Sequence, residues 1–379
     1  MLLNKKLRRN LNWYIPLATF LLIVVGLLAI SSAVELNKPG SYGILLLRKQ
    51  VVSVVLGSLL VIIIQFFDYH IYEHLSEIIY ISTVSVLATI LLIGYTVSGT
   101  KGWISLGPIN FQPSELAKVM IILVLAAVID RNKDQLKYLT GFIKPCIYIL
   151  IPFSLILLQN DLGTALVLIA ILIGMMYVGG ANTKFLLIIF GGGFLILILF
   201  IASHLIFDTP LIFLREYQLN RLLVFINPGV DIHDAGYNIF QSKIALGSGR
   251  LFGKGLFSGT QNQLHFLPEK HTDFIFSVIG EEFGYIGVVV VIALYLLLLW
   301  QIYNVARKAR DNYGRLVAVG IGTMFFFHVL ENIGMTMGLM PITGLPLPFI
   351  SYGGSSMITS LIAIGLVINV NIRRKKIMF

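Results

Sequence analysis

Long apolar runs separated by short polar segments make up most of the 379-residue chain. About ten of these runs reach roughly 20 residues, the length of a helix that crosses the hydrocarbon core of a bilayer. Gly and Pro recur inside them, which membrane helices tolerate because neighbouring groups satisfy the freed backbone. The pattern predicts an all-α, polytopic integral membrane protein with spans that begin near Tyr14, Leu46, Ser76, Ser114, Phe142, Leu162, Phe185, Thr272, Gly314 and Phe349.

The composition supports this fold class. Hydrophobic residues make up 57% of the chain and charged residues 12%, and the mean hydropathy is +0.88, whereas an ordinary soluble domain is roughly 45–50% apolar. Anionic lipid headgroups account for the net charge of +10 without any nucleic-acid partner. Cys146 is the only cysteine, which excludes an intrachain disulfide and a thiolate metal site. The basic and then apolar N-terminus predicts an uncleaved signal anchor.

The distribution of Lys and Arg predicts the orientation in the membrane, because cytoplasmic loops carry an excess of both. The short loops on the other side hold only Lys38, Arg48, Lys49 and Lys101. We therefore predict cytoplasmic termini, and a large extracytoplasmic loop over residues 208–271 between spans 7 and 8. The residues that fall on the cytoplasmic side are Lys5, Lys6, Arg8, Arg9, Arg131, Lys133, Lys137, Lys144, Lys184, Arg307, Lys308, Arg310, Arg315, Arg373, Arg374, Lys375 and Lys376.

Residues 1–379 are predicted to form one membrane domain whose 208–271 loop is partly helical. Residues 213–225 and 235–246 carry apolar side chains at helical spacing, which is typical of helices that lie on a membrane surface. Residues 247–260 are rich in Gly and lie beside Arg250 and Lys254, a composition that suits a phosphate. This signal is weak because the stretch has no preceding strand and no Walker spacing, so a flexible loop is the simpler interpretation.

Four segments that break the apolar pattern fall on the predicted outer face. They are residues 98–113, 159–164, the long loop and 340–356, all rich in Gly, Pro or polar groups. Irregular backbone at membrane depth is tolerated only inside protein or around water. The four segments therefore predict a shared cavity that opens outward.

Asp273 is the most informative charged residue, because it stands where the eighth apolar run begins. One interpretation is a helix N-cap, since Asp favours helix starts and the dipole there stabilises negative charge. The other is a general base, which must stay ionised at neutral pH although desolvation raises its pKa. The sequence leaves both open.

Other polar residues inside the predicted spans also have two interpretations. Glu115 and Lys118 stand three residues apart and share one helix face, either as a structural ion pair or as a lysine presented to an anion. Asp161 is a candidate helix cap. Helix-bridging hydrogen bonds are the favoured role of Glu281, Glu282, Glu331 and Asn332.

Several segments together resemble the SEDS family (shape, elongation, division and sporulation), and within it the RodA branch rather than the FtsW branch. The resemblance covers nearly the whole chain. One departure lies at Gln159–Asp161, where the family more often has a central proline; Asn160 is expected to cost little because the aspartate is kept. The matching segments are KGWISLG, FQPSELAK, QNDLGTAL, AGYNIFQSKIALGSG, GTQNQLHFLPEKHTDFIFSVIGEEFG and ENIGMTMGLMPITGLPLPFISYGGSS.

The resemblance implies a peptidoglycan glycosyltransferase that polymerises lipid II at the outer face of the cytoplasmic membrane during cell elongation. It implies a class B penicillin-binding protein and other elongation-complex membrane proteins as partners. The essential aspartate of the family falls on Asp273, its acid and lysine on Glu115 and Lys118, and its loop tryptophan on Trp103.

The chemistry that follows is inverting transfer of a glycan from its undecaprenyl pyrophosphate to a sugar hydroxyl of lipid II, with Asp273 as the base. The departing pyrophosphate needs cations, for which Lys118, Lys101, Arg221 and Lys243 are candidates. His271, beside the base, is a further candidate substrate-binding residue. We expect no dedicated metal site, only Mg²⁺ or Mn²⁺ held by the pyrophosphate.

Two other functions compete with this one. A lipid II flippase predicts a polar path across the membrane with charges near its midplane. A scaffold that only recruits the penicillin-binding protein leaves Asp273 without a task. The polar segments gather on one face, which favours the enzyme.

Overall fold

The computed structural model describes residues 12–34, 42–97, 99–106, 109–207, 216–226 and 235–374. Nine helical segments within these ranges are long and apolar enough to cross a membrane, which confirms the predicted polytopic fold. They are α2 (Tyr14–Ala33), α3 (Tyr42–Ile64), α5 (Ser76–Ile93), α7 (Leu139–Leu158), α8 (Leu162–Gly179), the continuous run of α9 (Thr183–Leu186), the π-helix η1 (Leu187–Gly191) and α10 (Gly192–Phe207), α14 (Ile275–Arg307), α15 (Asn312–Met337) and α16 (Gly354–Ile372).

A tenth helix of similar length, α6 (Pro113–Arg131), lies inside the bundle. It carries two acidic and two basic residues, more charge than a span exposed to lipid tolerates. Most of its 19 residues are buried, including Glu115 and Lys118. Neighbouring helices therefore shield Glu115 and Lys118 from lipid, and α6 lies where the fourth span was predicted.

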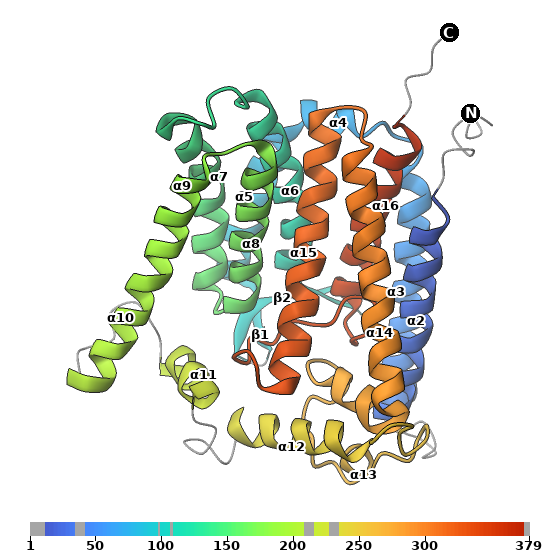
Figure 1. The fold of residues 1–379 in the computed structure, drawn as a ribbon. Helices are drawn as coiled ribbons and strands as arrows, with labels where there is room; N and C mark the ends of the chain where they lie inside the picture. The colour runs from blue at the N-terminus through green and yellow to red at the C-terminus, as the bar shows by residue number, and fades with distance from the viewer. Residues whose placement is uncertain are drawn as a thin grey trace.

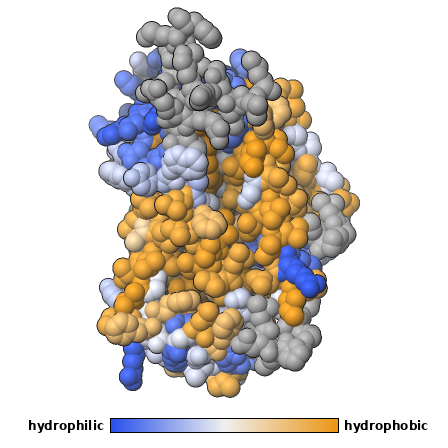
Figure 2. Space-filling model, turned by 90° about the vertical axis from the view of Figure 1, so that its right-hand side faces the viewer, coloured by the Kyte–Doolittle hydropathy of each residue, from blue (hydrophilic) through white to orange (hydrophobic). Residues whose placement is uncertain are grey.

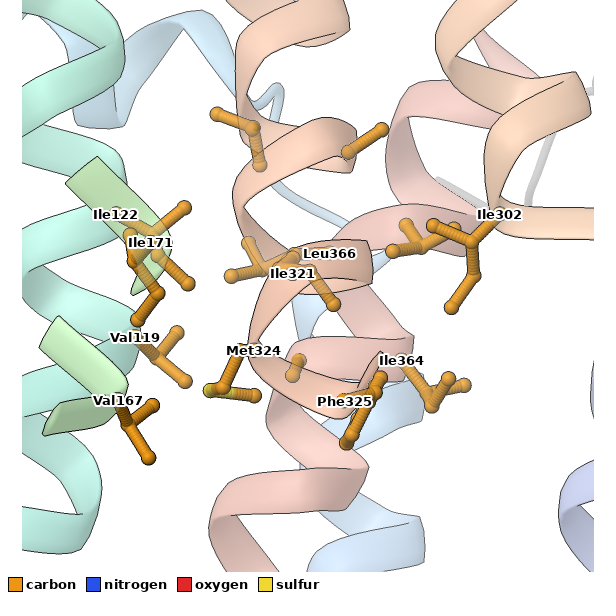
Figure 3. Packing of buried hydrophobic residues seen from close by; sticks show 14 of the residues in the cluster. Val119, Ile122, Val167, Ile171, Ile302, Ile321, Met324, Phe325, Ile364 and Leu366 are labelled. Atoms are coloured by element: carbon orange, nitrogen blue, oxygen red, sulfur yellow. The ribbon is translucent and has the colours of Figure 1, made fainter. Parts of the chain in front are cut away.

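The centre of the bundle is α15, which lies between α6 and α8 on one side and α14 and α16 on the other (Figure 3). Ile321, Met324 and Phe325 of α15 are buried against these neighbours. Small residues let the helices approach closely, as is typical of membrane helices. A Cβ added at Gly320 would lie 2.7 Å from atoms of Ile122 and Met175. Tightly packed apolar side chains thus fill the middle of the bundle.

The loop between α5 and α6 forms a small antiparallel sheet of β1 (Tyr95–Val97), β2 (Thr100–Leu106) and β3 (Ile109–Phe111). Trp103 pairs with Tyr95, and Ile104 pairs with Phe111. The sequence analysis expected only irregular backbone here. The sheet is too short to change the fold class, but it presents Trp103 at one end of the bundle.

Helices α11 (Glu216–Ile226), α12 (Ala235–Ser248) and α13 (Thr260–Gln263) lie at the same end as the sheet (Figure 1). We call this the cavity end. Helices α11 and α12 match the two helices predicted in the long loop, whose residues 208–215 and 227–234 lie outside the described ranges. Figure 2 shows a band of hydrophobic surface between two more polar ends. Such a band is what a bilayer requires.

The opposite end of the bundle carries α4 (His70–His74), together with the start of α2 and the end of α16. The predicted cytoplasmic Lys and Arg residues that are described all fall at this basic end, since they stand where the helices begin or end there. Lys5, Lys6, Arg8, Arg9, Lys375 and Lys376 lie outside the described residues.

Candidate active site

A cavity of about 1160 Å³ lies at the cavity end of the bundle. All four segments predicted to converge contribute to its lining, for example through Trp103, Asp161, Arg221 and Thr343. Their convergence on one cavity is therefore confirmed.

Asp273 lines this cavity, in a turn just before α14 begins at Ile275. The N-cap of α14 is Phe274, and it makes no side-chain capping bond. The interpretation of Asp273 as an N-cap is therefore wrong, because the turn places it one residue too early. Its carboxylate lies against the backbone of Gly344, where an added Cβ would be 3.4 Å from Oδ2. The carboxylate is left available to a ligand.

The environment of Asp273 raises its pKa to about 6. Burial is the main cause and the negative charge of Glu269 adds to it, while Arg221 and a hydrogen bond from Thr272 act in the opposite direction. A carboxylate with this pKa is ionised at neutral pH, yet it is a much better proton acceptor than an ordinary aspartate. These are the properties of a general base.

Two predicted substrate-binding residues flank Asp273 in the cavity lining. His271 lies beside the ring of Tyr352, at a centroid distance of 5.6 Å, and burial lowers its pKa. Burial therefore favours the neutral form of the imidazole. Arg221 reaches the cavity from α11, and its Nη1 donates to the carbonyl of Thr343 at 3.2 Å. An imidazole and a cation thus stand close to the Asp273 carboxylate.

The pair Glu115 and Lys118 forms the predicted ion pair, with Lys118 Nζ 2.8 Å from Glu115 Oε1. Glu115 lines the cavity and Lys118 does not. Lys118 is buried and also lies 2.9 Å from Nε2 of His328, on α15. His328 was not predicted, because an apolar helix gives no sign of a partner 210 residues away. Lys118 therefore affects the cavity indirectly, through its ion pair with Glu115.

Two cations that the sequence analysis treated as loop charges line the cavity, namely Arg48 and Lys49. Both were counted among the charges of the short outer loops, although the predicted span began near Leu46; α3 begins at Tyr42, so both residues lie on the helix. The signal was present in the sequence: they are adjacent cations where an apolar run begins. They supply positive charge on the α3 side of the cavity.

Asp161 confirms its predicted role as a helix cap, and it also lines the cavity. Its Oδ1 accepts from the backbone of Thr164 at 3.0 Å, and its Oδ2 accepts from Gln112 Nε2 at 3.0 Å. Burial raises its pKa. Because these hydrogen bonds already hold its carboxylate, Asp161 shapes the cavity wall between α6 and α8.

Two predicted substrate-binding lysines lie outside the cavity lining. Lys101 stands on β2, and its backbone N–H donates to the carbonyl of Gln159. Lys243 is exposed on α12 beside Gly338. The structure does not bring either ammonium group to Asp273, so a role for them in substrate binding stays a prediction.

The Gly-rich stretch 247–260 packs on the first turns of α14 instead of forming a phosphate loop or a free loop. Lys254 Nζ lies 2.7 Å from the buried Glu281 Oε1. The N–H groups of Lys254 and Gly255 donate to the carbonyls of Glu281 and Glu282. Glu282 also accepts from Ser32 of α2, which confirms a helix-bridging role. Lys254 and these backbone donors thus have protein partners, which favours a structural role for them; phosphate binding by this stretch stays a prediction.

Within the described ranges, no three His, Cys, Asp or Glu side chains are placed to hold a metal ion. A divalent cation held by the oxygens of a substrate pyrophosphate stays a prediction.

The FtsW/RodA/SpoVE family model, described as "Cell cycle protein", matches residues 12–376. The peptidoglycan glycosyltransferase MrdB of Escherichia coli K12 is 34% identical, over 94% of this chain and 94% of that protein. The peptidoglycan glycosyltransferase RodA of Treponema pallidum is also 34% identical, over 95% and 98%. A probable peptidoglycan glycosyltransferase FtsW from a Geobacter species is 36% identical, over 91% and 92%.

Solved structures give the same result. A chain from a peptidoglycan synthase complex, reported for its coordination of polymerization and crosslinking, superposes with a TM-score of 0.79 and 31% identity. The overlap covers 96% of this chain and 98% of that one. The rod shape determining protein RodA of Thermus thermophilus superposes with a TM-score of 0.70 and 29% identity, over 97% and 98%.

Proposed function

This chain belongs to the FtsW/RodA/SpoVE family and is a multi-pass membrane peptidoglycan glycosyltransferase, and from that premise we propose that it polymerises lipid II in the cavity, with Asp273 as the general base. The observation that carries this assignment is the carboxyl group of Asp273. It lines the cavity, caps no helix, has a pKa of about 6 and faces a space that cations also line.

The reaction begins with the acceptor sugar hydroxyl against Asp273. The carboxylate removes the hydroxyl proton as the oxygen attacks the anomeric carbon of the growing glycan. The bond between that carbon and the pyrophosphate breaks on the opposite face, so the configuration inverts through an oxocarbenium-like transition state. The proton ends on Asp273 and passes to water in the cavity. One glycosidic bond forms for each polyprenyl pyrophosphate released.

Three cations in the lining are available to the departing pyrophosphate: Arg48, Lys49 and Arg221. Positive groups that are held in place stabilise charge as it develops on a leaving group. Arg48 and Lys49 are adjacent on α3, and Arg221 approaches from α11. The cavity therefore has cations on two sides.

The polyprenyl tails require an apolar exit from the cavity into the bilayer. Leu45 and Val52 of α3 line the cavity and are also 46% and 47% exposed. They flank Arg48 and Lys49 along the same helix. A pyrophosphate at these cations would therefore direct its tail along α3 toward lipid.

We place the cavity on the extracytoplasmic side, as part of a single membrane domain over residues 1–379. The basic end lies opposite the cavity end, and basic loops favour the cytoplasm. The 208–271 loop, which includes α11 to α13, is then extracytoplasmic. Lipid II presents its sugar and peptide on that side during polymerisation.

A transpeptidase that crosslinks the new strand is the partner we propose, of the class B penicillin-binding protein type, within an elongation complex. The support is the likeness to a chain from a synthase complex that coordinates polymerization and crosslinking.

The test uses the purified full-length chain in lipid nanodiscs with labelled lipid II. We expect glycan strands from the wild-type protein and none from Asp273→Asn, with both proteins folded by thermal unfolding. Polymer from Asp273→Asn would overturn the assignment of the base. Movement of lipid II across vesicles without polymer would support a transporter instead.

A further inference from the structure

We propose that Gln50 and the segment Ser351–Gly353 form a rigid bridge that fixes Asp273 relative to the cations Arg48 and Lys49. This inference rests on the proposed function, in which these groups act on the same reacting bond. Gln50, Ser351 and Tyr352 are positioning residues in this scheme, since they act through the segments that they hold.

One end of the bridge holds the turn that carries Asp273. The hydroxyl of Ser351 donates to the carbonyl of Thr272 at 2.6 Å. The backbone N–H of Tyr352 donates to the carbonyl of His271 at 2.9 Å. Asn332 of α15 holds the next carbonyl, that of Asp273, through a hydrogen bond of 3.0 Å. Three consecutive carbonyls are therefore fixed, which leaves the Asp273 backbone little freedom.

The other end of the bridge holds α3. Gln50 Nε2 donates to the carbonyl of Ser351 at 3.2 Å, and Gln50 Oε1 accepts from the N–H of Gly353 at 3.1 Å. Gln50 is fully buried and follows Arg48 and Lys49 directly in the same helix. A helix is stiff over three residues, so holding Gln50 also holds the backbone of both cations.

The bridge itself is rigid. The hydroxyl of Ser351 accepts from the backbone N–H of Leu347 at 2.8 Å, and the N–H of Ser351 donates back to the Leu347 carbonyl at 2.9 Å. Helix α2 packs directly on Phe349 and Ile350, the two residues before the segment: a Cβ added at Gly26 would lie 2.6 Å from the Phe349 carbonyl oxygen and 2.7 Å from Ile350 Cα. Phe349 is held at a φ of 68°, a conformation that side chains other than Gly rarely adopt. Such a conformation persists only where the surroundings enforce it.

A fixed spacing between Asp273 and the cations Arg48 and Lys49 matters for the rate of the proposed reaction. Asp273 takes the proton while the cations receive the pyrophosphate, and both events belong to one transition state. A displacement of about 1 Å between reacting groups can cost on the order of 100-fold in rate. Binding depends less on this spacing, because each cation still attracts its phosphate. Removing the hydrogen bonds of Gln50 or Ser351 should therefore lower kcat more than it raises KM.

The experiment compares Gln50→Leu, Ser351→Ala and the double variant, each as the full chain in nanodiscs with lipid II. We expect each single change to lower kcat by about 10- to 100-fold, with KM changed less than kcat. The double variant should be no slower than the slower single variant, since both changes remove the same connection.

The matched control is Gln65→Leu. Gln65 is a buried glutamine just past the C-terminal end of α3 that donates to the Gly365 carbonyl of α16 at 3.0 Å. Its kcat should match the wild-type value.

Wild-type kcat in Gln50→Leu, or losses that multiply in the double variant, would overturn the bridge. A second readout does not depend on activity. In a Cys146→Ser background, spin labels at Ile44→Cys and Glu269→Cys report the spacing of α3 and the Asp273 turn. The distance distribution should broaden with Gln50→Leu or Ser351→Ala and stay narrow with Gln65→Leu. If the wild type makes no polymer, the proposed function fails, and these distances still decide whether the bridge exists.

Discussion

Lys118 Nζ lies 2.8 Å from Glu115 Oε1 and 2.9 Å from His328 Nε2, and of these three side chains only Glu115 lines the large cavity. The lysine thus neutralises and orients a carboxylate in the cavity lining. This geometry favours a structural role for Lys118 over direct contact with a pyrophosphate.

Removing the lysine should therefore damage both the fold and the site. Lys118→Met leaves Glu115 buried without its cation, which costs about 3–5 kcal/mol in comparable buried pairs. We expect a clear fall in the thermal unfolding temperature together with loss of polymerisation. The double variant Glu115→Gln/Lys118→Met should regain most of the stability but not the activity. Full stability in Lys118→Met alone would contradict the buried pair.

Comparing the turnover of Lys118 and Glu282 variants tests whether activity depends more on the Lys118 ion pair than on another buried glutamate. Glu282 accepts hydrogen bonds from two neutral groups, Ser32 and Asn262, so Glu282→Gln keeps a similar shape and loses no ion pair. We expect Lys118→Ala to lower turnover more than Glu282→Gln does. Turnover assays on equal amounts of folded protein decide the order, and the reverse order would move the important charge from Glu115 to the α14 region.

The pH dependence should report the base. Asp273 must be ionised to accept a proton, so kcat/KM should rise with pH up to its pKa of about 6 and level off above it. Below that value, the rate should fall about tenfold per pH unit as the carboxylate becomes protonated. An ordinary aspartate would place this limb near pH 4.

Removing the charge of Glu269 or of Arg221 should shift the acidic limb of the pH profile in opposite directions. The negative charge of Glu269 raises the pKa of Asp273 and Arg221 lowers it. Glu269→Gln should therefore move the limb to lower pH, and Arg221→Gln should move it higher. Rate profiles of the three proteins at matched ionic strength test this. A limb that does not move in either variant would assign the base to another group.

How far the sequence predicts this molecule depends on the range of the interactions involved. The spans, the helices of the long loop and the converging polar segments follow from local hydrophobic patterns, and the structure confirms them. Arg48 and Lys49 were missed because they were counted as loop charges, although they follow the predicted start of the span near Leu46 and lie on α3. The contacts of Lys118 with His328, and of Gln50 with Ser351, join residues 210 and 301 positions apart. No local pattern encodes such pairings.

Asn160 adopts a backbone conformation that proline cannot adopt. The resemblance suggested that asparagine merely replaces a proline here, but Asn160 has a φ of 63° and its N–H donates to the carbonyl of Leu157 at 3.0 Å. Proline has a φ near −65° and no N–H, so this turn between α7 and α8 excludes it.

We expect Asn160→Pro to destabilise the protein by more than about 1 kcal/mol and to reduce activity, because Asp161 follows directly in the cavity wall. Asn160→Gly should be close to wild type, since glycine accepts a positive φ. Thermal unfolding and turnover of both variants test the prediction. A fully active Asn160→Pro would mean that the turn adopts another backbone conformation.

Gly344 tests whether the space around the Asp273 carboxylate matters beyond backbone strain. Its φ is 79°, and an added Cβ would lie 3.4 Å from Asp273 Oδ2. Gly180, at the end of α8 away from the cavity, has a φ of 93° and open space around an added Cβ. Alanine at either position therefore carries a similar backbone cost of about 1–2 kcal/mol, but only Gly344→Ala places a methyl group against the base. We expect both variants to unfold at lower temperature, and only Gly344→Ala to lose turnover per folded molecule. Equal turnover in the two variants would show that the carboxylate does not work from the position against Gly344, and that backbone strain alone explains the loss of stability.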